Sequence, residues 1–276
     1  MAPLDLAVLP EYDEVPFEAR TKYWLNFVRE DHMREMQFLL KKAKLGNKPR
    51  KTGAGFVGWN NVMKHNVGQA AAMRVLGKAL NLEDNATRNL EEYAFIHNPT
   101  IHRDKFQQKV SGGGSTENLP DSEKFTQAES EALDARSEEL HDEIDPERWG
   151  ALATSPEFFE YIANQPGQTI EEQAETVWFP QLLVYYIDAL FDDSTLMAAH
   201  DRIERMEKRR PDLNADEDLT GDLGMKYWDA ERAVSTKIQE MVWERLKEND
   251  IELESHEDVP EFIRKQIAQE MLHPTS

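Results

Sequence analysis

Apolar residues recur every three to four positions along most of this chain, and no long stretch alternates apolar and polar residues. Residues 17–44 are an example, with apolar side chains at Phe17, Tyr23, Trp24 and Phe27. A three-to-four spacing places such residues on one face of a helix, whereas alternation is the signal of a strand. The pattern therefore predicts an all-α fold.

The same spacing predicts further helices along the chain. They are expected over residues 59–80, 87–97, 155–165, 169–191, 194–209, 224–248 and 258–271. Asp84 or Asn85 is suited to cap the second of these helices, and Pro180 is expected to kink a helix or to start a new one. Residues 107–124 contain a run of glycines and almost no large apolar side chain, which predicts a loop.

These elements predict one core domain with helical extensions at both ends. We expect an N-terminal helical extension with a basic joint over 1–54, a helical core over 55–213 and C-terminal helices over 214–276. The core contains a strongly acidic insertion at about 107–147. Such a segment is either an exposed, solvated insertion or a lid over a site.

The chain of 276 residues carries 32 Lys and Arg against 53 Asp and Glu, a formal net charge of −21. This acidity argues against broad binding to DNA or RNA. No apolar run approaches the roughly 20 residues that span a bilayer, and the first residues lack the features of a secretory signal. With no cysteine, disulfides and thiolate nucleophiles are excluded, and a cytoplasmic location is expected. The basic run 41–51 is either a binding surface for an anionic substrate or a solvated helix end.

Three residues are candidates for chemistry: His65 and His97 in or at the end of helices, and Asp188 inside an apolar, aromatic helix. A buried carboxylate is costly without a cation, a metal ion or hydrogen bonds. Imidazole and carboxylate groups together suit a divalent metal. Each residue taken alone also fits a structural role, and for Asp188 that role is an ion pair with Arg or hydrogen bonds from Tyr hydroxyls.

Three motifs follow one another in the sequence: H-N-V-x-x-A at His65, two apolar residues and a histidine at the helix end at His97, and Y-x-D-A-L at Asp188. Taken together, they resemble the HD-domain phosphohydrolase superfamily over residues 55–213. The resemblance implies an HD-like helical bundle and a divalent ion (Mn, Ni, Co, Zn, Fe or Mg) held by these residues and Asn98. It also implies hydrolysis of a nucleotide or another small phosphoester by a metal-bound water.

The chain departs from the family pattern at Asn98, where the family has an aspartate ligand. An amide supplies a neutral oxygen, which weakens the binding of Mg²⁺ most and that of Ni²⁺, Co²⁺ or Zn²⁺ less. His102 and Asp104 are candidate replacement ligands. The cations expected beside the phosphate are Lys64, Arg103 and Lys105.

The departure leaves a second hypothesis open: a degenerate HD fold that binds a ligand or a protein without hydrolysis. A third is an all-α scaffold whose acidic segment meets a basic partner. The helices at both ends are also candidate surfaces for a homo-oligomer.

Overall fold

The computed structural model describes residues 61–96, 169–192, 195–217 and 223–272. It also describes isolated positions at 19, 23, 48–49, 57–58, 127–128, 131, 135, 139, 167 and 221. This part of the chain is mainly helical, with two very short antiparallel ladders as its only strands. The all-α prediction is confirmed.

The principal helices are α3 (Asn61–Ala79), α4 (Asp84–Ile96), α8 (Ile170–Glu175), α9 (Phe179–Ala189), α10 (Ala199–Arg209), α12 (Tyr227–Glu248) and α13 (Val259–Leu272). Two 3-10 turns are η6 (Pro211–Ala215) and η7 (His256–Asp258). The ladders pair β1 (Lys48–Pro49) with β2 (Val57–Gly58), and β3 (Phe191–Asp192) with β4 (Thr195–Leu196).

The region 169–191, in which Pro180 is expected either to kink a helix or to start a new one, contains two helices. α8 begins with a capping box, in which Glu172 N donates to Thr169 Oγ1 (3.2 Å) and Thr169 N donates to Glu172 Oε2 (2.9 Å). Pro180 lies in the first turn of α9, where its missing N–H breaks no intrahelical hydrogen bond. The proline therefore starts a new helix, which was one of the two outcomes expected.

Two other helices begin at residues that differ from the predicted ones. α4 starts at Asp84 itself, and α10 starts at Ala199 because Thr195 and Leu196 are used in the β3–β4 ladder. The helix expected over 155–165 lies outside the described residues, as do most of 17–44 and most of the acidic insertion.

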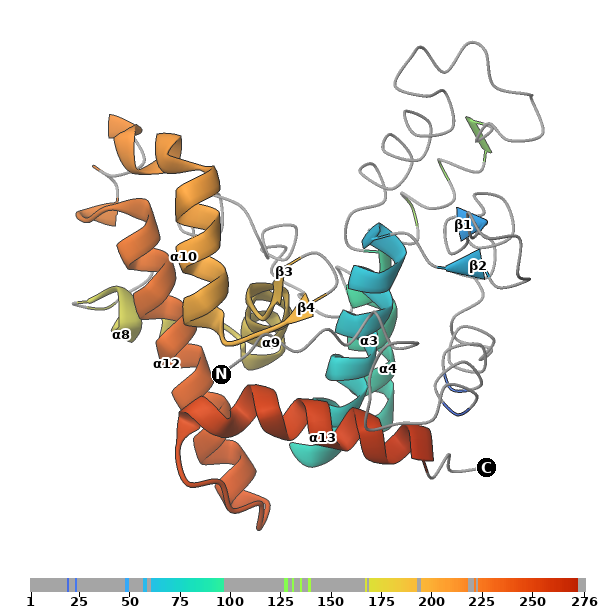
Figure 1. The fold of residues 1–276 in the computed structure, drawn as a ribbon. Coiled ribbons are helices and arrows are strands. Elements are labelled where there is room, and N and C mark those ends of the chain that lie inside the picture. Colours follow the sequence, from blue (N-terminus) through green and yellow to red (C-terminus); the bar gives the residue numbers. More distant parts are fainter. Residues whose placement is uncertain are drawn as a thin grey trace.

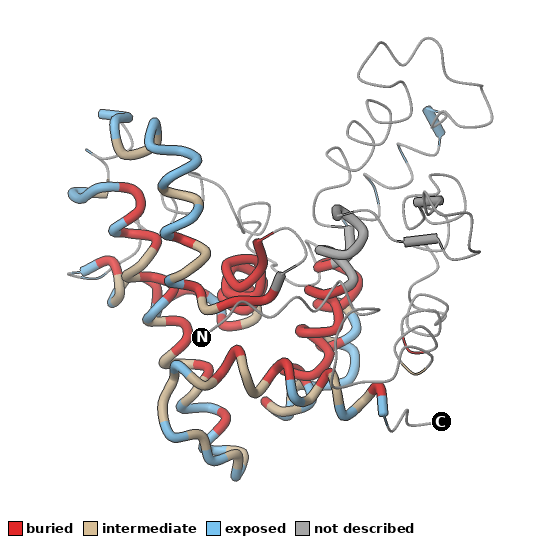
Figure 2. The backbone as a smooth tube through the Cα atoms, in the orientation of Figure 1, coloured by how far each residue is buried: buried red, intermediate tan, exposed pale blue. Residues whose placement is uncertain are grey.

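The most buried element is α9, which is buried from Gln181 to Ala189 (Figure 2). In Figure 1 the antiparallel pair α3 and α4 lies on one side of α9, α10 and α12 lie on the other, and α13 crosses below. Buried residues of α12 and α13, such as Val242 and Ile263, belong to the same hydrophobic cluster as α3 and α9. The two C-terminal helices therefore complete the core that surrounds α9.

Close packing of α3 on α4 depends on a small residue. A Cβ atom on Gly77 of α3 would lie 2.6 Å from the side chain of Thr87 of α4. The turn between the helices places Asn81 at φ 52°, in the left-handed region that Asn tolerates. None of the described helices is both long and apolar enough to cross a membrane.

Candidate functional site

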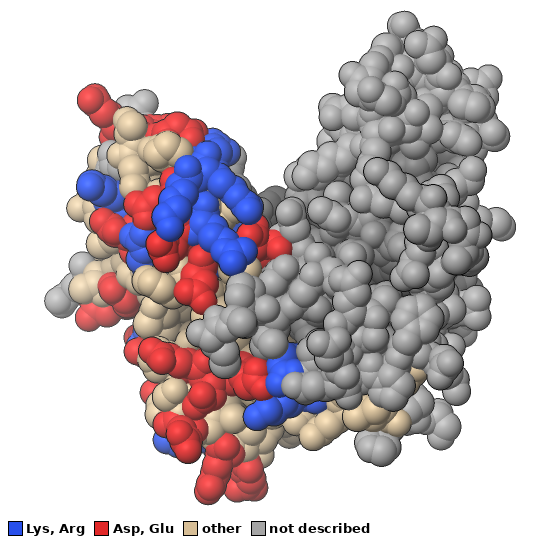
Figure 3. Space-filling view, viewed as in Figure 1, with Lys and Arg blue, Asp and Glu red and all other residues tan. Residues whose placement is uncertain are grey.

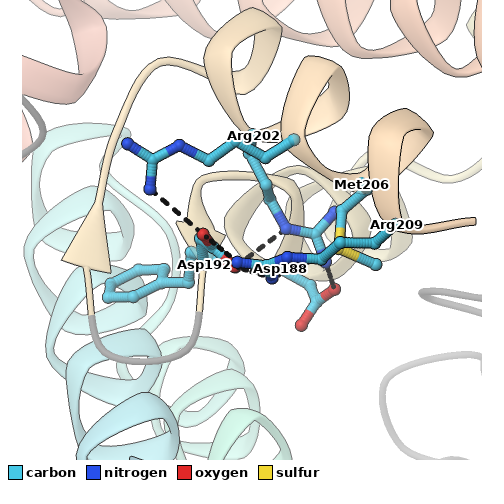
Figure 4. A network of polar contacts seen from close by, with 7 residues as sticks. Asp188, Asp192, Arg202, Met206 and Arg209 are labelled. Carbon is cyan, nitrogen blue, oxygen red and sulfur yellow. Dashed lines mark hydrogen bonds and ion pairs between the residues drawn. The ribbon is translucent and has the colours of Figure 1, made fainter.

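Asp188 lies near the end of α9 and is 6% exposed. Its Oδ1 accepts a 2.6 Å hydrogen bond from Gln69 Nε2 of α3, and its Oδ2 pairs with Arg202 Nη2 of α10 at 3.2 Å (Figure 4). Arg202 Nε also donates to the carbonyl oxygen of Phe191 (2.8 Å), which fixes the guanidinium. Asp188 therefore has an arginine ion pair, one of the structural roles that its sequence context left open.

A second carboxylate, Asp192 of β3, lies beside the first and pairs with two arginines of α10. Its oxygens accept hydrogen bonds from Arg209 Nη1 (2.6 Å) and Arg205 Nη1 (3.2 Å). Burial acts to raise the pKa of Asp192, but the hydrogen bonds from both guanidinium groups outweigh it and hold that pKa below its usual value. Lys and Arg side chains gather over α10 in Figure 3, and two of them are used here to anchor β3.

Only part of the metal site predicted from the sequence lies within the described residues. His65 and Lys64 are positions on α3, and their side chains are outside the description; His65 is one helical turn before Gln69. The other candidates follow the end of α4 and also lie outside the described residues: His97, Asn98, His102, Arg103, Asp104 and Lys105.

The helices α3 and α4 pack against each other. Because α3 and α4 run antiparallel, the start of α3 and the end of α4 are at the same end of the pair (Figure 1). Gln69, in the middle of α3, ties this helix to Asp188. Within the described residues, no group of three or more His, Asp and Glu side chains is arranged to hold a metal ion.

A cavity of about 150 Å³ lies between α9, α10 and α12 and has Asp188 in its wall. Its lining combines charged, aromatic and apolar side chains: Tyr185, Asp188, Ala189, Arg202, Met206, Arg210, Leu213, Tyr227, Trp228 and Glu231. The volume is about that of an engineered cavity that binds benzene. The cavity therefore has room for a small molecule and polar groups to orient it.

Glu231 of α12 is the second buried carboxyl group of this cavity, at 5% exposure. The hydroxyls of Tyr185 and Tyr227 hydrogen-bond to it. The hydroxyl of Ser235 lies 3.4 Å from that of Tyr185, within hydrogen-bond distance. Burial raises the pKa of Glu231 to about 7, although Arg202 and both tyrosine hydroxyls act to lower it.

Burial also raises the pKa of Tyr185 and of Tyr227, and the neighbouring Glu231 raises both further. Both phenols are therefore neutral hydrogen-bond donors at physiological pH. The group consists of two carboxyls, two phenols and one guanidinium, and burial brings the pKa of Glu231 close to neutral pH.

Sequence reasoning found Asp188 but missed Gln69, Arg202 and Glu231. Glu231 carried the same signal as Asp188, a carboxylate on an apolar helix face, because it follows Tyr227 by one turn and precedes Val234 by three residues. Gln69 and Arg202 lacked such a signal, since each lies among residues typical of any helix.

No protein-family model, no curated protein and no solved structure matches this chain.

Proposed function

We propose that this chain is a ligand-binding module, built on an HD-like helical bundle that has lost hydrolysis, and that its ligand occupies the cavity beside Asp188. The observation that carries the proposal is the ion pair of Asp188 with Arg202 in the wall of that cavity. A guanidinium already neutralises the carboxylate that the HD pattern reserves for a metal ion.

The energetics of the pair favour this function over metal binding. The side chains of Arg202 and Asp188 are 14% and 8% exposed. A dication bound to Asp188 would be repelled by the guanidinium, and displacing Arg202 would leave a buried charge unpaired. Asn98 in place of an aspartate removes a second negative charge from the predicted metal ligands. Asp188, the one predicted metal ligand whose side chain is described, is already paired with Arg202 and is therefore a poor fit to a divalent ion.

A second candidate function is a divergent HD-type metal-dependent phosphohydrolase acting on a nucleotide or another small phosphoester. The hydrogen bond from Gln69 favours it, because it ties Asp188 to α3 one turn after His65. In this function His65, His97 and Asp188 would be the ligands, and the ion would supply an activated water for hydrolysis.

Elemental analysis of untagged protein distinguishes the two functions. Wild type and Asp188→Asn are compared after exposure to Mn²⁺, Ni²⁺ and Zn²⁺, and both are assayed for hydrolysis of a p-nitrophenyl phosphoester, with circular dichroism as the check on folding. We expect no stoichiometric metal and no hydrolysis. Near-stoichiometric metal that is lost in Asp188→Asn, together with hydrolysis, would overturn the proposal in favour of the phosphohydrolase.

The proposal that this bundle is HD-like and has lost hydrolysis leads to a separate prediction for Asn98. If this residue replaces a metal-binding aspartate, Asn98→Asp restores one carboxylate and should create or strengthen divalent-metal binding. Asn85→Asp, on the exposed start of α4, adds the same charge away from the predicted ligands and should have no effect. Equal metal binding by both variants and wild type counts against an HD-derived site.

A further inference from the structure

Among the described residues, the cavity beside Asp188 is lined by side chains from three helices and a 3-10 turn, and these include charged and aromatic groups. α9 contributes Tyr185 and Asp188, α10 contributes Arg202, and α12 contributes Tyr227 and Glu231. Its volume of about 150 Å³ limits an occupant to the size of benzene, about six heavy atoms. The occupant is therefore a small molecule or the end of a larger one.

The buried charges of the cavity do not balance when Glu231 is ionised. The charge of Arg202 acts on Glu231, but its guanidinium is bonded to Asp188 and to the Phe191 carbonyl oxygen. Arg210 lies at the rim with its side chain 53% exposed, and it forms its ion pair with Asp212. Among the described residues that line the cavity, two buried carboxyl groups thus face one buried guanidinium, and with Glu231 ionised these three groups together carry a net negative charge.

Aromatic rings form much of the remaining wall. Tyr227 and Trp228 are in contact edge to face, with ring centroids 4.8 Å apart and planes at 87°, and Tyr185 lines the cavity beside them. Aromatic faces attract organic cations, and the attraction is strongest where water is excluded. An anion of the same size would instead meet the charges of Asp188 and Glu231 in the same space.

We propose that this cavity binds a small organic cation, an ammonium or guanidinium group of about six heavy atoms, with Glu231 as its counter-ion and Tyr185, Tyr227 and Trp228 around it. This inference rests on the proposed function and names the class of its ligand. Burial raises the pKa of Glu231 to about 7. A cation bound beside this carboxyl group would favour its ionised form.

Matched probes of equal shape and different charge test the inference. Tetramethylammonium is compared with tert-butanol, and methylguanidinium with N-methylurea, by NMR titration of the full chain at pH 8; acetate is the anionic probe. We expect each cation to bind at least about tenfold more tightly than its neutral counterpart, and acetate not to bind. Cations that bind no better than their neutral counterparts would overturn the assignment.

A pair of variants on α12 identifies the counter-ion. Glu231→Gln keeps the size and the hydrogen-bonding capacity of the side chain, and it should lower cation affinity about tenfold. Glu244→Gln makes the same charge change at an exposed position of α12 and should leave affinity unchanged. If both variants bind the cations as wild type does, Glu231 is not the counter-ion.

Wild-type protein supplies a readout that does not depend on a folded variant. Its affinity for tetramethylammonium should rise from pH 6 to pH 8 as Glu231 ionises, and a flat profile would contradict the inference. If the neutral probes bind as tightly as the cations, the cavity binds small molecules but the cationic ligand class is wrong, and the proposed function stands. Failure of all probes to bind, combined with hydrolysis that depends on metal and on Asp188, would overturn the proposed function as well.

Discussion

The side-chain amide of Gln69 donates a 2.6 Å hydrogen bond to Asp188, a residue 119 positions later in the chain. This bond joins α3 to α9 at the position where Arg202 of α10 reaches the same carboxylate. Asp188 is therefore held between an amide from one helix and a guanidinium from another. The arrangement fixes one wall of the cavity in which Glu231 lies.

Removing the carboxylate of Asp188 should destabilise the fold. Asp188→Ala leaves the guanidinium of Arg202 buried without its partner, and we expect a loss of about 3 kcal/mol in the free energy of unfolding, measured by urea denaturation. Glu204→Ala breaks the exposed pair with Lys208 and should change the free energy of unfolding little, because solvent screens that pair. Equal losses for the two variants would show that burial does not strengthen the Asp188 pair.

Ionisation of Glu231 should lower stability as the pH rises. Burial raises its pKa in the folded protein to about 7, above the ordinary value of 4.5, so the folded state binds the proton more tightly. The contribution of this group is full below pH 4.5 and is lost as the pH rises through 7. Between pH 5 and pH 8 it should fall by up to about 3 kcal/mol.

The effect of Glu231 is isolated by measuring urea unfolding of wild type and Glu231→Gln at both pH values. The stability of wild type relative to the variant should decrease from pH 5 to pH 8. Parallel pH profiles for the two proteins would mean that the carboxyl does not titrate in this range.

The contact of α3 with α4 should not tolerate a methyl group at Gly77. A Cβ atom there would lie 2.6 Å from both Cγ2 and Oγ1 of Thr87, a short side chain that is itself buried. We expect Gly77→Ala to lower stability by about 1–3 kcal/mol in thermal or urea unfolding, despite the higher helix propensity of alanine.

Two further variants make the Gly77 prediction specific. Adding Thr87→Ala to Gly77→Ala should recover part of the loss, because it removes the two nearest atoms that the new methyl group meets and leaves only the Cβ atom of residue 87, at 3.0 Å. Gly221→Ala, where a Cβ atom meets nothing within 4 Å, should have little effect. A stable Gly77→Ala protein would show that α3 and α4 move apart at little cost.

Gln181 is fully buried, and within the described part of the chain both of its side-chain polar atoms lack a hydrogen-bond partner. Burial of an unpaired amide costs about 1–3 kcal/mol. Gln181→Met keeps a similar length without polar atoms and should be neutral or stabilising in urea unfolding. Marked destabilisation would indicate that the amide is hydrogen-bonded in solution.

Local sequence features were sufficient for much of the fold. The three-to-four spacing predicted helices at α3, α12 and α13 because the spacing of apolar residues acts within a single element. Pro180 marked a break for an equally local reason, since its ring and missing N–H are compatible with the first turn of a helix. The start of α10 was missed because it depends on strand pairing between residues on both sides of a turn.

The sequence by itself determined that this chain is helical and that Asp188 needs a partner, because an apolar helix with a carboxylate on its buried face is visible in the residue order. Only the tertiary structure decided that the partners include Arg202 and Gln69, and that Glu231 faces the same cavity. Residue spacing fixes which side chains share a face of one helix. Which faces meet is set by the packing of the whole core, and that packing brings distant charges together.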